Sequence, residues 1–327
     1  MSAEGGTKAV VAALLANSGI AVLKFLAWLL TGASSLLAES IHSIADAGNQ
    51  GLLLVGGWRA KKEATDEHPF GYGRERYIYS FIVAIVLFSV GGLFALYEAF
   101  HKFQEVQAGH ENELVESGFA WVAIVVLVGA IVMESLSFRT AIRESNKIRR
   151  DAGWVEFIRR AKSPELPVIL LEDLAALLGL TFALAGVGLT LITGNAYWDV
   201  VGTASIGVLL VAVAIVLALE TKSLLLGESA SPEAQDQIRE ALESTPGIER
   251  VIHMKTLHLG PEELLVAVKA GVAREATAAQ VAASINAAER AIREVEPTAA
   301  VIYIEPAIYV ENHVPDVRPE PPSPAGH

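Results

Sequence analysis

The sequence predicts a membrane protein that joins an all-α domain of six transmembrane helices to a small α+β domain. Two observations support this fold class. Hydrophobic residues make up 52% of the 327 residues and the mean hydropathy is +0.43, which is too apolar for an ordinary soluble protein. The apolar runs lie before residue 227, whereas the rest of the chain has a soluble composition. We therefore expect a transmembrane domain over 1–227, a soluble domain over 228–310 and a tail over 311–327.

Six apolar stretches are each long enough to cross a bilayer. They are Val10–Leu30, Ser35–Gly56, Ile78–Tyr97, Phe119–Leu136, Val168–Leu191 and Val200–Leu219. The loops over 58–76 and 139–166 are rich in lysine and arginine, and the connections on the other side carry almost none. The positive-inside rule places these two loops in the cytoplasm, and with six spans both termini lie there too. No organelle signal is evident, so a bacterial inner membrane is the simplest expectation.

The region after the last span alternates between helix and strand patterns. The expected elements are a helix from Ser231 to about Ser244, strands over 251–259 and 264–272, a helix over 276–295 and a strand over 299–306. This αββαβ order predicts a ferredoxin-like sandwich with its helices on one face of the sheet. The tail over 311–327 is rich in proline and polar residues, and we expect it to be disordered.

Charge and cysteine content exclude several kinds of ligand. The formal charge of −12 leaves no surplus of basic residues for nucleic acid. The chain has no cysteine, so any metal must be bound through nitrogen and oxygen atoms.

The second span carries polar side chains at helical spacing. Asp46 follows His42 by four residues and Asn49 follows Asp46 by three, so the three project from one face, with neighbouring side chains about 5–6 Å apart. An imidazole and a carboxylate at that spacing can chelate one cation. Charged groups at membrane depth are costly unless they face a cavity, a partner or an ion. This face is therefore the first candidate functional site.

The fifth span contains two adjacent acids, Glu172 and Asp173. Neighbouring residues on a helix diverge by about 100°, so we expect Asp173 to face the second span and Glu172 to be either a fourth ligand or paired elsewhere. Lys24 in the first span is interpreted as a snorkelling lysine or a hydrogen-bond donor between helices.

One imidazole with two or three carboxylates suits a divalent cation. Zn²⁺ is the commonest occupant of such sites, and Mn²⁺, Fe²⁺ and Co²⁺ are alternatives that the sequence does not rank. Because the ligands must lose protons to bind metal, metal and protons compete for the same groups. This competition gives a physical basis for exchanging a metal ion for protons across a membrane.

Several separate motifs resemble the cation diffusion facilitator family. They are TGASSLLAESIHSIAD, HPFGYGRERY, LLEDLAALLG and WDVVGTASIGVLLVAVAIVLALETKSLLLGESA, and their wording is most similar to the mitochondrial-zinc-transporter-like branch. The resemblance covers most of residues 8–309. It implies a homodimer of six-helix subunits, a cytoplasmic ferredoxin-like domain at the dimer contact, and proton-coupled export of a divalent metal from the cytoplasm.

The resemblance also assigns site residues. His42 and Asp46 fall on the family's ligands in the second span, and Asp173 falls on the second ligand of the fifth span. Ile169 departs from the pattern, because many zinc-transporting members have histidine or aspartate there. Glu172, Asn49 or water would then have to complete a four-ligand site.

Secondary metal positions are implied in two further places. Asp66 and His68 lie in the loop where some members of the family bind a second metal. In the soluble domain His253 matches one family position, Glu305 replaces an aspartate, and His258 is a substitute ligand.

Three rival functions are compatible with these residues. The first is an intramembrane metal hydrolase, in which the same groups would activate water. The second is a sensor that binds a metal without moving it. The third is an exchanger of a monovalent cation for protons. The hydrolase is disfavoured, because no HExxH motif is present, and the chain is not expected to be an enzyme.

Overall fold

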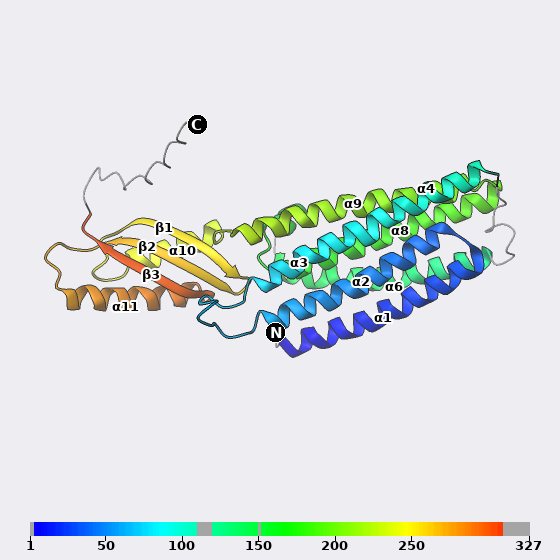
Figure 1. The fold of residues 1–327 in the computed structure, drawn as a ribbon. Coiled ribbons are helices and arrows are strands. Elements are labelled where there is room, and N and C mark those ends of the chain that lie inside the picture. The colour runs from blue at the N-terminus through cyan, green and yellow to red at the C-terminus, as the bar shows by residue number, and fades with distance from the viewer. Residues whose placement is uncertain (1–2, 110–119, 150–151, 310–327) are drawn as a thin grey trace, which may run out of the picture. The chain divides into compact units, whose positions relative to one another are not determined.

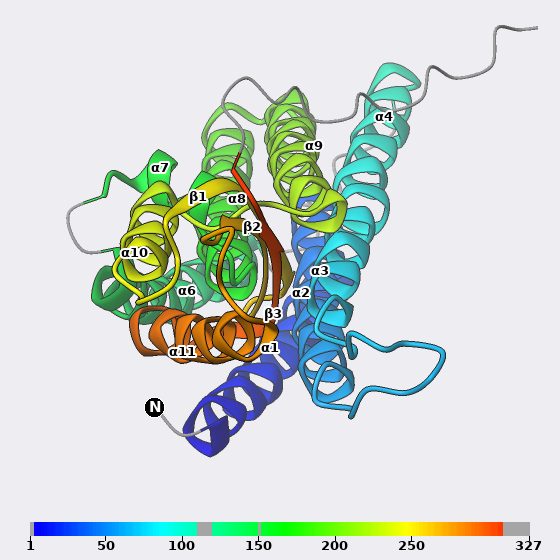
Figure 2. The ribbon, with the colours of Figure 1, turned by 90° about the vertical axis from the view of Figure 1, so that its left-hand side faces the viewer.

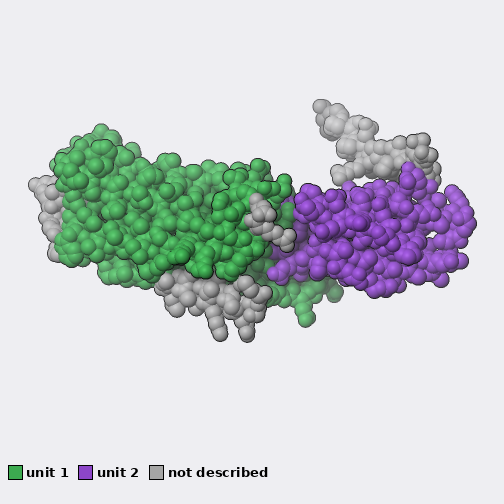
Figure 3. All heavy atoms as spheres, turned by 180° about the vertical axis from the view of Figure 1, so that it is seen from behind, with its two compact units in different colours: residues 1–226 green, residues 227–327 purple. Residues whose placement is uncertain are grey.

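The computed structural model describes residues 3–109, 120–149 and 152–309. The chain forms two compact units, Met1–Leu226 and Gly227–His327, which Figure 3 colours separately. The proline-rich tail over 311–327 lies outside the described residues, and its disorder stays a prediction.

Unit 1 is built from long helices, which Figure 1 shows lying side by side. Its described elements are α1 (Ala3–Thr31), α2 (Ser34–Arg59), α3 (Glu75–Val86), the π-helix η1 (Leu87–Leu93), α4 (Phe94–Gln107), α6 (Ala120–Arg149), α7 (Trp154–Arg160), α8 (Glu165–Thr193) and α9 (Tyr197–Leu226). The segments α3, η1 and α4 follow one another as one continuous helix over Glu75–Gln107. The bundle is all-α, as the hydropathy pattern predicts.

Among the described residues, four helices are long and apolar enough to cross a membrane: Glu75–Gln107, Ala120–Arg149, Glu165–Thr193 and Tyr197–Leu226. The two remaining spans of the sequence prediction correspond to α1 and α2. Of α1, the stretch Asn17–Thr31 counts as a shorter apolar helix among the described residues. In α2 the acidic and amide side chains lower the hydropathy of the helix. Six membrane crossings therefore stay a prediction.

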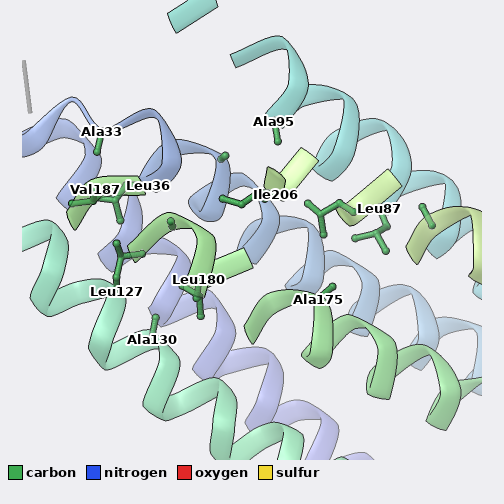
Figure 4. Packing of buried hydrophobic residues seen from close by; sticks show 14 of the residues in the cluster. Ala33, Leu36, Leu87, Ala95, Leu127, Ala130, Ala175, Leu180, Val187 and Ile206 are labelled. Atoms are coloured by element: carbon green, nitrogen blue, oxygen red, sulfur yellow. The ribbon is translucent and has the colours of Figure 1, made fainter. Parts of the chain in front are cut away.

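The core of unit 1 consists mainly of alanine, leucine and valine side chains between the helices. Figure 4 shows Leu36, Leu180 and Ile206 among these side chains. Glycines allow the closest approach. A Cβ on Gly186 would lie 2.9 Å from the carbonyl oxygen of Trp198, and one on Gly202 would lie equally close to a carbonyl oxygen of α8. Small residues of this kind let membrane helices pack backbone to backbone.

Unit 2 contains α10 (Pro232–Glu243), β1 (Arg250–Gly260), β2 (Glu263–Gly271), α11 (Ala278–Val295) and β3 (Ala299–Ala307). This αββαβ order is the one that the sequence predicts. The strands form one sheet in the order β1-β2-β3, antiparallel between β1 and β2 and parallel between β2 and β3. The ferredoxin-like assignment rests on this order and stays a prediction.

Local sequence signals explain where the helices of unit 2 begin. The Ser231 hydroxyl accepts a hydrogen bond from the Ala234 amide, with proline in the first turn of α10. Thr277 and Gln280 form a capping box at the start of α11. The two helices lie side by side (Figure 2), and their apolar residues pack with alternate residues of β2.

Candidate metal centre

The start of α2 is fixed by a hydrogen-bonded acid that lies 165 positions later in the sequence. Asp199, in the first turn of α9, accepts hydrogen bonds at Oδ2 from the Ser34 amide (3.0 Å) and hydroxyl (3.1 Å). Its Oδ1 accepts bonds from the Ser35 hydroxyl (2.6 Å) and amide (3.4 Å). A carboxylate is favourable at a helix N-terminus because it meets unpaired N–H groups and the positive end of the helix dipole. The contact therefore sets the position of α2.

Along α2, His42 and Asp46 come together as their spacing predicts. The His42 Nε2 and Asp46 Oδ2 atoms are 3.4 Å apart, and the two residues are only 1% and 6% exposed. Neither ring nitrogen of His42 has a hydrogen-bond partner, nor does Oδ1 of Asp46 or Oδ1 of Asn49. Buried polar atoms are nearly always paired. Unpartnered nitrogen and oxygen atoms of these kinds are the ligand types that divalent cations accept.

The two acids of α8 point to different neighbours. The Asn49 side-chain amide donates to Glu172 Oε1 at 2.7 Å, and the Ser137 hydroxyl of α6 donates to Asp173 Oδ2 at 3.0 Å. Sequence reasoning put Asp173 against the second span and left the place of Glu172 open. In the structure Glu172 is hydrogen-bonded to α2 through Asn49, and Asp173 is hydrogen-bonded to α6 through Ser137. Both acids, together with Glu134, interact electrostatically with Asp46.

A π-helix lies beside the imidazole. Segment η1 packs against α2, and a Cβ added to Gly91 would lie 3.9 Å from His42 Nδ1. Single π-helical turns inside α-helices are frequent at functional sites. Hydropathy gives no signal for this wider turn, and the sequence analysis did not find it.

Of the two sequence interpretations of Lys24, the structure confirms the hydrogen-bond donor between helices. Its side chain is fully buried, so it does not snorkel to the membrane surface. The ammonium donates to Glu39 Oε2 at 3.0 Å and to the Ser43 hydroxyl at 2.8 Å. Sequence reasoning missed Glu39, although opposite charges in neighbouring apolar helices were a signal for such a pair.

Within residues 3–109, 120–149 and 152–309, no three histidine, cysteine, aspartate or glutamate side chains are gathered closely enough to hold a metal together. Two candidate ligands, His42 and Asp46, are adjacent, and Glu172 is hydrogen-bonded to Asn49, three positions after Asp46 on α2. The assignment of the five candidates as ligands stays a prediction; they are His42, Asp46, Asn49, Glu172 and Asp173.

The loop candidates lie on the surface. Asp66 and His68 are exposed, and the His68 ring lies edge-on to Tyr72 with ring centroids 4.7 Å apart. The His68 amide donates to the Thr65 hydroxyl, which shapes the loop.

In unit 2, a lysine separates two of the candidates. His253 on β1 pairs with Lys269 on β2, and Lys269 pairs with Glu305 on β3. The Lys269 ammonium lies 2.9 Å from Glu305 Oε1, and its hydrogen bond and charge lower the pKa of Glu305. A positive charge between two ligands disfavours a metal there. His258 lies further along β1, is buried, and pairs with Leu264.

A bundle of apolar helices with buried, incompletely paired imidazole and carboxylate groups defines a multi-pass membrane protein with a polar site inside its bundle. The family model described as the cation efflux transmembrane domain matches residues 10–226. The chain belongs to this cation efflux family, also called the cation diffusion facilitators.

Curated relatives support the branch of the family that resembles the mitochondrial zinc transporter. The proton-coupled zinc antiporter SLC30A9, mitochondrial, of human and of mouse is 34% identical over 259 residues, covering 79% of this chain and 44% of the relative. Metal tolerance protein C4 of Arabidopsis thaliana is 28% identical over 256 residues, covering 78% of this chain and 54% of the relative. The magnetosome protein MamM of Paramagnetospirillum magneticum is 22% identical over 249 residues, covering 76% and 72%. The chain thus spans under half the length of its zinc-antiporter relatives.

Proposed function

We propose that this protein is an antiporter that exports Zn²⁺, or a related divalent transition metal, from the cytoplasm in exchange for protons by alternating access. The observation that carries the proposal is the pair His42 and Asp46, which is buried in α2 with three side-chain atoms unpartnered. Membership of the cation efflux family supports transport, rather than catalysis or sensing, as the role of this pair.

Proton coupling follows from the ligands. An imidazole and carboxylates bind a metal only after losing their protons. Protons that enter from the more acidic side therefore displace the metal, and release of those protons on the other side restores the binding form. The human and mouse relatives are named as proton-coupled zinc antiporters, which favours Zn²⁺ over Mn²⁺, Fe²⁺ and Co²⁺.

The same proposal includes an assembly and an orientation. Two copies would pair as a homodimer in a bilayer, with both termini in the cytoplasm. The basic loops over 58–76 and 139–166 support this orientation. For a free-living bacterium the membrane would be the inner one, whereas the named zinc-antiporter relatives are mitochondrial.

Flux into proteoliposomes tests the proposal. Purified protein is reconstituted with a Zn²⁺-sensitive dye inside the vesicles, and a pH gradient is imposed with the acidic side inside. We expect Zn²⁺ uptake that depends on the gradient and that collapses when a protonophore removes it. A matched Asp46→Asn variant should show background uptake.

The rival functions give different results in the same assay. A sensor or a hydrolase binds Zn²⁺ without flux, and a monovalent exchanger dissipates the gradient with Na⁺ or K⁺ in the absence of Zn²⁺. Wild-type protein that shows either pattern would contradict the proposal.

A further inference from the structure

A second buried charge cluster lies next to the candidate ligands. It consists of Lys24 in α1 with Glu39 and Ser43 in α2, and all three are buried. The ammonium bonds to Glu39 Oε2 and to the Ser43 hydroxyl. The other carboxylate oxygen, Oε1, has no partner and faces α8, where a Cβ on Gly179 would lie 2.6 Å from it.

This cluster shares a face of α2 with the metal ligands. Residues 39, 43 and 46 are spaced by four and three positions, which brings their side chains into one row on a helix, and His42 is three positions from Glu39. The charge of Lys24 acts on His42, Asp46 and Glu134 as well as on Glu39. A fixed cation therefore lies about one helical turn from the place where a divalent cation would bind.

Stability alone does not explain an ion pair here. Removing two charges from water is expensive, and apolar residues of similar volume often stabilise a buried position at least as well. The pair does have two electrostatic consequences for a neighbouring metal. Lys24 repels the metal directly, and it bonds to Glu39, which is a carboxylate in the same row of α2.

We propose that Lys24 is an affinity-setting residue of the transport site, which withholds the Glu39 carboxylate from the metal so that the bound ion is held loosely enough to leave. Transport requires a site that binds well enough to load and weakly enough to unload. The inference rests on the proposed function, since it concerns release of the same ion.

Removing the lysine charge should tighten metal binding. In Lys24→Met, Glu39 loses its internal cation and becomes an extra ligand or a nearby negative charge. We expect the dissociation constant for Zn²⁺ to fall roughly tenfold. In vesicles KM should fall, and kcat should fall with it, because release becomes slow.

Charge-matched variants separate this role from that of a simple tether between α1 and α2. Glu39→Gln leaves the ammonium uncompensated and should weaken Zn²⁺ binding. Lys24→Met combined with Glu39→Gln removes both charges and should bind Zn²⁺ within about threefold of wild type. Lys24→Arg keeps the positive charge, so its Zn²⁺ affinity should stay nearer to wild type than that of Lys24→Met. A tether predicts instead that Lys24→Met, Glu39→Gln and the double variant lose stability and affinity together.

The decisive experiment is calorimetric titration of Zn²⁺ into the purified full chain, with melting temperatures measured on the same samples. Wild-type protein without Zn²⁺ binding overturns the proposed function, whereas binding that is lost in Asp46→Asn upholds it. With binding established, equal or weaker affinity in Lys24→Met overturns the role of Lys24. If that variant does not fold, the double variant decides, and a loss of more than about threefold in its affinity overturns the role.

Discussion

Two buried polar contacts in unit 1 differ in how completely the chain satisfies them. Asp199 receives four hydrogen bonds from Ser34 and Ser35, two on each oxygen. His42 has no hydrogen bond on either ring nitrogen, and Asp46 has one oxygen without a partner. A buried group that its own chain satisfies contributes to the fold, because losing the partner would leave an expensive gap. A buried group left unsatisfied is available to a ligand.

The largest effect should come from the unsatisfied pair. Replacing His42 or Asp46 by alanine should reduce Zn²⁺ flux in vesicles to background, because either change breaks the buried pair of imidazole and carboxylate on α2. The melting temperature of the metal-free protein should not fall, since few bonds are lost. Flux at the wild-type rate in Asp46→Ala would remove the site from the account.

Asp199 should show the opposite pattern. Asp199→Ala leaves the start of α2 uncapped and should lower the free energy of unfolding by about 3 kcal/mol. The Zn²⁺ dissociation constant of the folded fraction should change little. Thermal unfolding and Zn²⁺ titration on one sample measure both quantities. A large loss of affinity at an unchanged melting temperature would mean that Asp199 belongs to the metal site.

Glu172 lies between these extremes, because it bonds to Asn49 and also acts on Asp46. Glu172→Gln keeps the shape and removes the charge, and we expect about tenfold weaker Zn²⁺ binding. Asp173→Asn is the matched control on the same helix. If Asp173→Asn weakens Zn²⁺ binding and Glu172→Gln does not, Asp173 is the ligand from α8, as expected from the sequence.

The smallest effect should come from unit 2. Lys269 lowers the pKa of Glu305, so Lys269→Met should raise that pKa toward its ordinary value, measurable by NMR titration. A lowered pKa stabilises the fold above the ordinary value of glutamate, and the contribution is lost as the pH falls through the lowered pKa. Because Glu305 is exposed, the change in stability should be small. Tight Zn²⁺ binding at Glu305 in the wild type would contradict the role of Lys269.

Features encoded by local spacing could be predicted from the sequence. The contact between His42 and Asp46 follows from four-residue spacing on a helix, whatever the helix packs against. The strand and helix order of unit 2 follows from the alternation of two periods, and the serine and threonine caps mark its helix starts.

Features that depend on how helices rotate against each other could not be predicted. The partners of Glu172 and Asp173 depend on the orientation of α8 about its axis, which two adjacent acids do not define. Asp199 meets Ser34 across 165 positions of sequence, and no local pattern links them. Lys24 and Glu39 meet for the same reason, although their opposite charges in apolar helices were a usable signal.

X-ray absorption at the zinc edge of the loaded, purified protein tests the central claim most directly, because it reports the atoms that surround the ion. The account predicts a shell of nitrogen and oxygen that includes one imidazole, and loss of that imidazole contribution together with the bound zinc in His42→Ala. An unchanged spectrum and unchanged zinc content in His42→Ala would contradict it.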